Sequence, residues 1–214
     1  MGNSWQPVIQ YSIGWLDVLG AGEHVDRNGL PGLADFATMR LLSGAKPVST
    51  LDYTISFRDM SREAIDARMN YLLIYGVYSG TSDAWNKPDV IANFEPVMSR
   101  YAPLLKAVDT AGYEVETLVD VEAERPGEIL LERWGYDPAE GLYLTCRNNG
   151  GAPAAVTLAF DEQLFTDPSG RPVEKVSELV DGTAVALDRA DGRILLKLTV
   201  PAGRTQLLRL ECAE

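Results

Sequence analysis

Two carboxylic acids in the first half of the chain each follow a short apolar run. Glu23 comes directly after residues 18–22, and Asp52 closes the run 47–52. A pair of carboxyl groups can protonate a departing oxygen and attack a sugar or activate a water, which is the usual chemistry of glycosidic cleavage. We therefore predict Glu23 and Asp52 as a catalytic pair, with the roles of acid and of nucleophile or base left open. Taken singly, Glu23 could simply open a loop and Asp52 could cap the next segment.

Residues that could bind a sugar follow or precede the same runs. Aromatic rings can stack on the apolar faces of sugars, while polar side chains can bind hydroxyl groups. The predicted substrate-binding residues are Trp15, His24, Tyr53, Tyr78, Asp83 and Trp85. His24 could also tune the carboxylate of Glu23. Aromatic residues fill protein cores as well, so at least one of these rings is expected to be structural.

Other site chemistries find little support in the residue types. With one histidine and only Cys146 and Cys212, the chain cannot assemble a closed zinc site of the usual kind. Both cysteines end alternating apolar runs, which predicts reduced thiols that face a core. A disulfide between them is the alternative if their strands are neighbours. The chain has neither a complete dinucleotide-binding glycine motif nor a phosphate-binding loop. We therefore expect no metal and no cofactor.

The elements that would position the two acids alternate along the first half. Apolar runs predict strands at 7–11, 18–22 and 47–53. Helical spacing predicts a helix that ends at Gly44, a second helix capped by Asp59 or Ser61 that runs to Tyr75, and a third from Glu95 to Gly112. Residues 76–90 are expected to be a loop. Such alternation is typical of parallel βα units.

After Gly112 the apolar pattern changes to a period of two. Strands are predicted at 113–119, 129–135, 142–147, 155–160, 175–180, 184–187, 194–200 and 205–212. Turn signals such as Asn149-Gly150 and Asp191-Gly192 separate them, which indicates an antiparallel β-sandwich. The acidic segment 120–124, which leads to Pro126, marks the predicted division into a domain of residues 1–119 and a domain of residues 120–214.

Several phrases of the sequence resemble the last repeats and the following β-sandwich of a (β/α)8-barrel glycoside hydrolase. The resemblance is carried by residues 72–80, the loop with Trp85, and residues 101–106, 111–115, 141–148, 156–158 and 200–203. It implies an α/β plus all-β fold, with a partial barrel before an antiparallel β-sandwich. It also implies a glycosidase that acts on a carbohydrate substrate.

The length of the first half does not accommodate a whole barrel. A complete barrel has eight βα units and about 250 residues, whereas residues 1–112 supply about four strands. The chain could be a fragment, a half-barrel that associates with a second copy, or a small open α/β sheet. We favour a homodimer, because an isolated half would expose a strand edge. A non-catalytic carbohydrate-binding or assembly module, or an inactive tail of a larger enzyme, is the alternative.

Charge and hydropathy exclude two classes of partner. The 19 basic and 31 acidic residues give a net charge of −12, which repels nucleic acid and anionic membranes. No run approaches the roughly 18 apolar residues that cross a bilayer, and the first residues lack the features of a signal peptide. We therefore expect a cytoplasmic chain that binds neither nucleic acid nor membranes.

Overall fold

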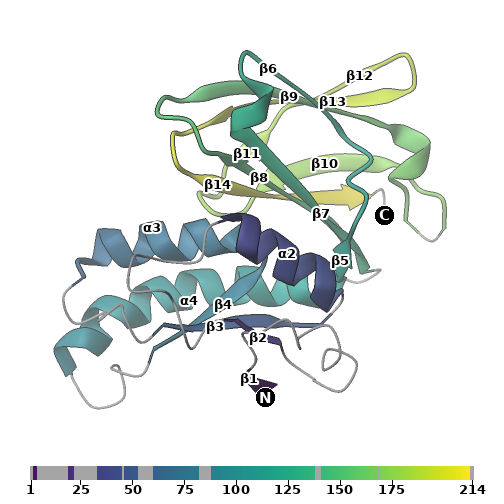
Figure 1. Cartoon of the computed structure of the whole chain (residues 1–214). Coiled ribbons are helices and arrows are strands. Elements are labelled where there is room, and N and C mark those ends of the chain that lie inside the picture. Colours follow the sequence, from purple (N-terminus) through teal and green to yellow (C-terminus); the bar gives the residue numbers. More distant parts are fainter. Residues whose placement is uncertain are drawn as a thin grey trace. The chain divides into compact units, whose positions relative to one another are not determined.

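The computed structural model describes residues 2–3, 19–21, 33–44, 46–52, 60–81, 88–137, 141–167 and 169–212. The chain divides into two compact units, Met1–Asp109 and Thr110–Glu214 (Figure 1). The first unit mixes helices with a parallel sheet, and the second consists of antiparallel sheets. This division lies ten residues before the predicted domain boundary at 119/120, which stays a prediction.

The first unit contains a four-stranded sheet whose strands follow one another in sequence order. The strands are β1 (Gly2–Asn3), β2 (Leu19–Ala21), β3 (Val48–Asp52) and β4 (Val77–Thr81). Every neighbouring pair is parallel. The helices are α2 (Leu33–Ser43), α3 (Arg62–Leu73) and α4 (Pro88–Ala111). α2 packs against β2 and β3, and α3 packs against β4. Parallel strands, which the sequence predicted for this half, are therefore present.

The two faces of this sheet differ in burial. Val48 of β3 and Val77 of β4 are register partners, and both are fully buried. Ser49 and Tyr78, the next register pair, point to the other face and are only partly buried. Crossovers between neighbouring parallel strands are almost always right-handed, so consecutive crossovers in one direction place their helices on one face. Val48 and Val77 therefore belong to the helix-covered face.

The prediction of a loop at 76–90 is wrong in part. Val77–Thr81 forms β4, which pairs with β3 over its whole length, and α4 begins at Pro88. A serine and a glycine inside this short segment weaken its strand signal. The segment nevertheless forms a strand because it lies beside β3 and pairs with it. The predicted strands at 18–22 and 47–53 correspond to β2 and β3, whereas the predicted strand at 7–11 lies outside the described residues.

Helices α2 and α3 end where the sequence signals predict. Ser61 is the N-cap of α3, and its hydroxyl accepts a hydrogen bond from the backbone N–H of Ala64. Gly44 follows α2 with a φ of 56°, and its N–H donates to the carbonyl of Arg40. Gly76 ends α3 in the same way, with a φ of 59° and a bond to the carbonyl of Leu73.

Helix α4 is longer than predicted and contains two internal prolines, Pro96 and Pro103. Its buried side, formed by Val97, Tyr101 and Leu105 with Val108, repeats at helical spacing. The two prolines are seven residues apart and therefore lie on one side of the helix, where Pro103 is exposed. The carbonyls that lose a partner to proline are then on the exposed side, where water can satisfy them.

The second unit is a β-sandwich of two antiparallel sheets. In spatial order, the six-stranded sheet consists of β11 (Ala184–Val185), β10 (Val173–Glu178), β14 (Thr205–Cys212), β8 (Gly141–Asn148), β7 (Ile129–Asp137) and β5 (Tyr113–Glu114). The four-stranded sheet consists of β12 (Leu187–Ala190), β13 (Arg193–Val200), β9 (Ala154–Asp161) and β6 (Asp120–Ala123). Short 3-10 helices, η4 (Pro126–Glu128) and η5 (Glu162–Leu164), precede β7 and follow β9. Every predicted strand of this half overlaps an observed one.

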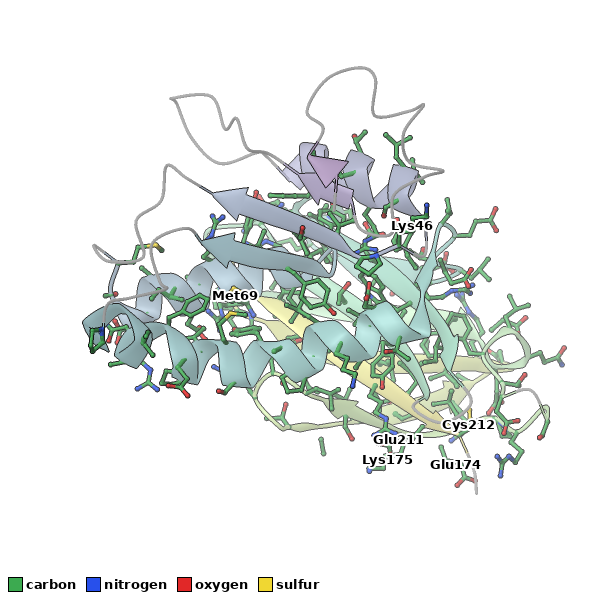
Figure 2. All side chains as sticks on the ribbon, turned by 90° about the horizontal axis from the view of Figure 1, so that it is seen from below. Lys46, Met69, Glu174, Lys175, Glu211 and Cys212 are labelled. Atoms are coloured by element: carbon green, nitrogen blue, oxygen red, sulfur yellow. The ribbon has the colours of Figure 1, made fainter. Side chains whose placement is uncertain are left out.

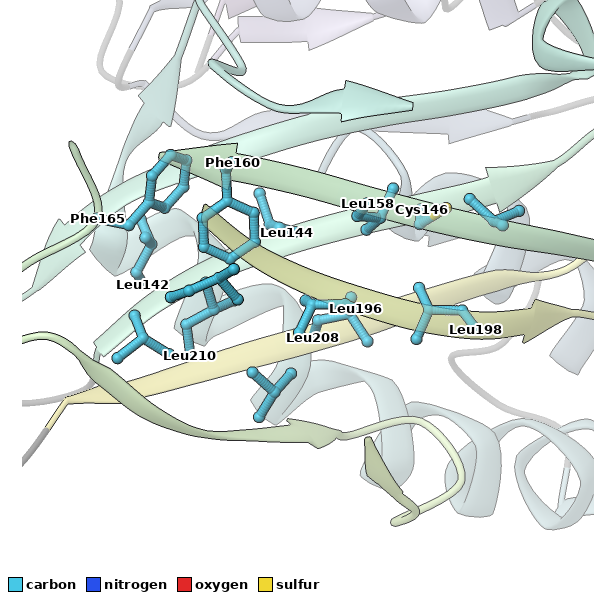
Figure 3. Packing of buried hydrophobic residues seen from close by; sticks show 14 of the residues in the cluster. Leu142, Leu144, Cys146, Leu158, Phe160, Phe165, Leu196, Leu198, Leu208 and Leu210 are labelled. Carbon is cyan, nitrogen blue, oxygen red and sulfur yellow. The ribbon is translucent and has the colours of Figure 1, made fainter. Parts of the chain in front are cut away.

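Side chains from both sheets form one apolar core (Figure 3). Leu144 and Leu208 come from the six-stranded sheet, and Leu158 and Leu196 from the four-stranded sheet; all four are fully buried. The rings of Phe160 and Phe165 pack at one end of this core, with centroids 4.4 Å apart. The alternating pattern of the sequence therefore corresponds to one inward-facing row on each strand.

The acidic segment 120–124 contributes a strand rather than only a connection. Asp120–Ala123 forms β6, which pairs antiparallel with β9. Asp120 and Glu122 are exposed, whereas Val121 and Ala123 pack against the sandwich core. The alternation is hard to recognise in the sequence. Two of the four residues are acidic, and the two that face inward have only small or medium apolar side chains.

The two cysteines lie on neighbouring strands but at different levels. Cys146 faces the core, as predicted, and burial raises the pKa of its thiol to about 12. Its register partner on β14 is Gln206. Cys212 lies six residues further along β14, a distance of about 20 Å, whereas a disulfide needs Cα atoms within about 7 Å. This register excludes a disulfide between the two, and neither cysteine forms one within the described residues.

Glu178 holds the turn after β10 in place. Its side chain is fully buried, and its two carboxylate oxygens accept hydrogen bonds from the backbone N–H groups of Val180 and Asp181 at 2.8 and 2.6 Å and of Leu207 at 3.3 Å. Glu174, on the same strand, is exposed instead (Figure 2). The two residues therefore form a matched pair for substitution.

We expect Glu178→Gln to lower the free energy of unfolding of the second unit by about 2 kcal/mol. The amide keeps one acceptor oxygen, and its NH2 group faces backbone donors that lose their partner. Glu174→Gln should change the stability by less than about 0.5 kcal/mol. Urea unfolding followed by far-UV circular dichroism measures both, and equal midpoints for the two variants would contradict the role of Glu178.

Candidate functional site

The carboxyl ends of three strands of the first unit meet at one edge of its sheet. β2, β3 and β4 are parallel and end at Ala21, Asp52 and Thr81. Asp52 and Thr81 are register partners. Asp52 therefore ends its strand, as the sequence predicted, at the edge where parallel α/β proteins gather their active-site residues.

Most predicted site residues lie outside the described part of the chain, namely Glu23, Trp15, His24, Tyr53, Asp83 and Trp85. In sequence, Glu23 is the second residue after β2, Tyr53 is the first after β3 and Asp83 is the second after β4. Their participation in a site stays a prediction.

Tyr78 is the predicted site residue whose side chain the structure describes. It is the second residue of β4, three residues before the strand's carboxyl end at Thr81. Three residues of strand span about 10 Å, so Tyr78 lies toward the amino edge of the sheet. The structure therefore does not place Tyr78 at the edge where Asp52 ends β3.

A polar cluster of Arg40, Tyr78 and Asp109 lies toward this amino edge. Arg40 of α2 is fully buried, and its guanidinium donates three hydrogen bonds. Nε reaches the carbonyl of Tyr75 at 2.8 Å, Nη1 that of Lys46 at 3.0 Å and Nη2 that of Gly76 at 2.8 Å. These carbonyls precede β3 and β4, so one side chain joins α2 to the starts of two strands.

Burial raises the pKa values of the two acid groups in this cluster. It raises the pKa of the Tyr78 phenol to about 12, with a further contribution from the negative charge of Asp109. It also raises the pKa of the Asp109 carboxyl, which the charge of Arg40 opposes in part. Within the described part of the chain, Oδ1 of Asp109 is buried without a hydrogen-bond partner. The ionised carboxylate of Asp109 therefore costs the fold free energy.

We expect Asp109→Asn to stabilise the protein at neutral pH. Since the folded-state pKa of Asp109 is raised, its unfavourable contribution appears as the pH rises from the unfolded value of about 3.9 through the folded pKa, and is complete above it. The melting temperature of the variant should exceed that of the unmodified chain at pH 7, and the gain should vanish below pH 4. Calorimetry across this range measures the difference; a lower melting temperature at pH 7 would contradict the argument.

The chemistry of this cluster is that of a structural contact. A guanidinium bound to three main-chain carbonyls is occupied, and a phenol whose pKa is about 12 is neutral at physiological pH. Sequence reasoning did not single out Arg40 or Asp109. Arg40 shares the buried face of α2 with Phe36, and Asp109 lies in the last turn of α4, where the helix dipole disfavours an anion. Both positions are therefore unusual places for a charged residue, and the sequence pattern alone could have marked them.

The described residues contain no group of three or more histidine, cysteine or acidic side chains arranged for a metal ion. None of the helices in the described ranges combines the length and the apolar character needed to cross a bilayer.

Aromatic side chains of the second unit are engaged inside it. Trp134 is fully buried, and its Nε1 donates to the hydroxyl of Thr145 at 3.2 Å. Tyr113 packs edge-on against Trp134, with ring centroids 5.5 Å apart, and donates its phenolic hydrogen to Glu132 at 2.8 Å. Tyr143, Phe160 and Phe165 are buried. Among the side chains described for this unit, none is an exposed ring on which a sugar could stack.

Comparison with known proteins gives structural neighbours only. No protein-family model matches the chain, and no curated protein does. An Anoxybacillus alpha-amylase is similar at a TM-score of 0.42 and 14% identity, over 78% of this chain and 39% of that one. A Thermotoga maritima alpha-fucosidase in complex with fucose is similar at 0.37 and 11%, over 78% and 40%. The chain thus spans about two-fifths of these glycoside hydrolases.

Proposed function

We propose that the protein is a glycoside hydrolase whose catalytic carboxylates are Glu23 and Asp52. The observation that carries the proposal is the direction of β2, β3 and β4, which brings the carboxyl ends of the three strands to one edge. Asp52 ends β3, and Glu23 follows the neighbouring strand by two residues. Acids that follow adjacent parallel strands come close enough to act on one substrate.

Three features of the first unit support a partial (β/α) barrel. The strands follow sequence order without reversal, unlike the strands of a doubly wound sheet. Right-handed crossovers then place α2 and α3, the helices that connect these strands, on one face, as in a barrel wall. The opposite face carries Ser49 and Tyr78, which are only partly buried. This face is the inner wall of the proposed barrel.

The two acids divide the chemistry between them. One protonates the oxygen of the leaving group, and the other attacks the anomeric carbon or removes a proton from water. The separation of the carboxyl groups determines the stereochemistry: about 5 to 5.5 Å corresponds to retention and about 6.5 to 9.5 Å to inversion. Tyr53, Trp85, Trp15, His24 and Asp83 are proposed to bind the sugar.

Hydrolysis of a panel of aryl glycosides tests this function. We expect release of the phenol from at least one sugar, with a linear dependence on protein concentration once the protein is fully assembled. Calorimetric titration with the same sugars distinguishes an enzyme from a binding module. A sugar that binds and is not cleaved would identify a carbohydrate-binding module. The absence of both binding and cleavage across the panel would contradict the proposal.

A further inference from the structure

We propose that Asn149 is a site of spontaneous deamidation, and that opening of the turn between β8 and β9 controls the rate of the reaction. β8 ends at Asn148 and β9 begins at Ala154. The turn lies within the second unit, so the inference is independent of the proposed hydrolysis. The reaction converts a neutral side-chain amide into a carboxylate or into an isoaspartyl linkage of the main chain.

The residue types at this turn favour the reaction. Asparagine followed by glycine cyclises readily, because glycine has no Cβ beside the attacking nitrogen and adopts the backbone conformations that ring closure needs. The sequence contains this pair at 28–29 and at 149–150, and the second pair lies within the described residues. The side chain of Asn149 is exposed, so water reaches it and ammonia can leave.

The reaction has two steps and uses water as its only co-reactant. The backbone nitrogen of Gly150 attacks Cγ of Asn149, the Cγ–Nδ2 bond breaks, and Nδ2 leaves as ammonia with the proton of the Gly150 N–H. The product is a five-membered succinimide. Water then opens the ring at either carbonyl, which gives aspartate or isoaspartate at position 149. In sum, one water is added, one ammonia is lost and the chain gains one negative charge.

The closed turn holds the attacking nitrogen in place. The N–H of Gly150 donates to Oδ1 of Asn148 at 2.7 Å. A neutral amide oxygen binds this proton but does not remove it, so the nitrogen stays a weak nucleophile. Asn148 is fully buried, and its Nδ2 donates to the carbonyls of Ala152 at 2.8 Å and Val200 at 3.0 Å. The side chain of Asn148 is therefore fixed, and it fixes Gly150.

The closed turn also directs the side chain of Asn149 away from that nitrogen. Oδ1 of Asn149 accepts a hydrogen bond from Nε of Arg147 at 2.8 Å, and its backbone N–H donates to the carbonyl of Glu128 at 2.8 Å. The amide is thus held toward a residue two positions earlier, whereas ring closure needs Cγ beside the nitrogen of the next residue. The observed rate is then the intrinsic rate multiplied by the fraction of open turns.

The modification makes the opening permanent. The chain is packed closely at Gly150, where an added Cβ would collide with Oε2 of Glu128. Isoaspartate at position 149 lengthens the main chain by one carbon beside this contact. The lengthened turn cannot restore both the bond from Gly150 to Asn148 and the bond from position 149 to Glu128. Each reaction therefore converts a transient opening into a lasting one.

Peptide mapping of the full-length protein tests the site. The protein is incubated in mildly alkaline buffer, either folded or in urea, and then digested with trypsin, which cleaves after Arg147. Tandem mass spectrometry of the peptide that begins at Asn148 locates the conversion of amide to acid. We expect the reaction at Asn149 to be slower in the folded protein than in urea by a factor of about ten or more. A rate in the folded protein equal to or above the rate in urea would overturn the proposal.

A matched pair of substitutions tests the role of Asn148. Asn148→Ala removes the acceptor of the Gly150 N–H, and Gln163→Ala removes an exposed side-chain amide elsewhere in the sandwich unit. The first should raise the rate in the folded protein by a factor of about ten, and the second should not change it. Equal rates in the two variants would overturn the proposal.

Arg147→Lys serves if Asn148→Ala does not fold, because lysine keeps the charge and the trypsin site but loses the Nε that binds Asn149. We expect a faster reaction in the folded variant. A slower reaction would show that Arg147 activates the amide, and would overturn the proposal. Hydrogen exchange tests the lasting opening: chains aged in urea and refolded should lose protection at the amide of Gly150, and unchanged protection in chains with isoaspartate would overturn that part.

Discussion

Glu23→Gln and Asp52→Asn are each expected to lower kcat for an aryl glycoside by a factor of about 10² to 10⁴. This is the range contributed by a group that transfers a proton in the transition state, and the loss of a nucleophile costs at least as much. An amide is nearly the same size as the carboxylic acid it replaces but cannot exchange a proton near neutral pH. Steady-state rates on a reactive aryl glycoside measure the effect.

Asp66→Asn is the matched control for these two variants. Asp66 lies on α3 and pairs with Arg100 at 3.1 Å, with part of both side chains in solvent. Its substitution should leave kcat unchanged, and thermal unfolding should be similar for all three variants. Unchanged rates in both Glu23→Gln and Asp52→Asn would end the assignment. A loss of kcat in Glu23→Gln but not in Asp52→Asn would show that Asp52 is structural and that another carboxylate completes the catalytic pair.

Arg40→Met is expected to lower the free energy of unfolding of the first unit by about 3 kcal/mol. Each hydrogen bond from a charged donor contributes roughly 1.5 to 3 kcal/mol, and Arg40 makes three to main-chain carbonyls. Methionine also removes the desolvation penalty of a buried cation, so the net loss is smaller than the sum of the three bonds. Arg40→Lys should be nearly as damaging, because an ammonium group lacks the planar fork that reaches all three carbonyls.

Hydrogen exchange measures this effect within one unit of a two-unit chain. Protection of the amides of β3 and β4 should fall in Arg40→Met, while protection of the sandwich strands stays the same. Arg62→Met, at the exposed start of α3, should change neither. Equal protection of β3 and β4 in Arg40→Met and in the unmodified chain would show that the three hydrogen bonds do not hold the strands.

The sandwich was predictable because its signal is local. Leu142, Leu144 and Cys146 alternate with residues of the opposite face, and the strand that they predict is β8. The same alternation of apolar residues predicts the strands β13 and β14. The end of α2 at Gly44 and the N-cap Ser61 of α3 were predictable for the same reason, since each depends on a few neighbouring residues.

β4 and β6 were not predictable from such signals. Val77–Thr81 contains serine and glycine, and Asp120–Ala123 contains two acids, so neither resembles a buried strand. Each becomes a strand because a neighbour, β3 or β9, offers it a complete row of backbone partners. The candidate site divides in the same way. The position of Asp52 at a strand end followed from the sequence, whereas the displacement of Tyr78 toward the opposite edge did not.

The sequence by itself determined which segments are amphipathic, where two of the helices stop and which rows of side chains face a core, since these properties depend on residues close together in the chain. Only the tertiary structure decided that the parallel strands of the first unit lie side by side in sequence order, that Asp52 ends level with Thr81, and that Arg40 binds carbonyls more than thirty residues away. The order of strands in a sheet, their register and the burial of a charge are properties of contacts between distant segments, and no local pattern of residues encodes them.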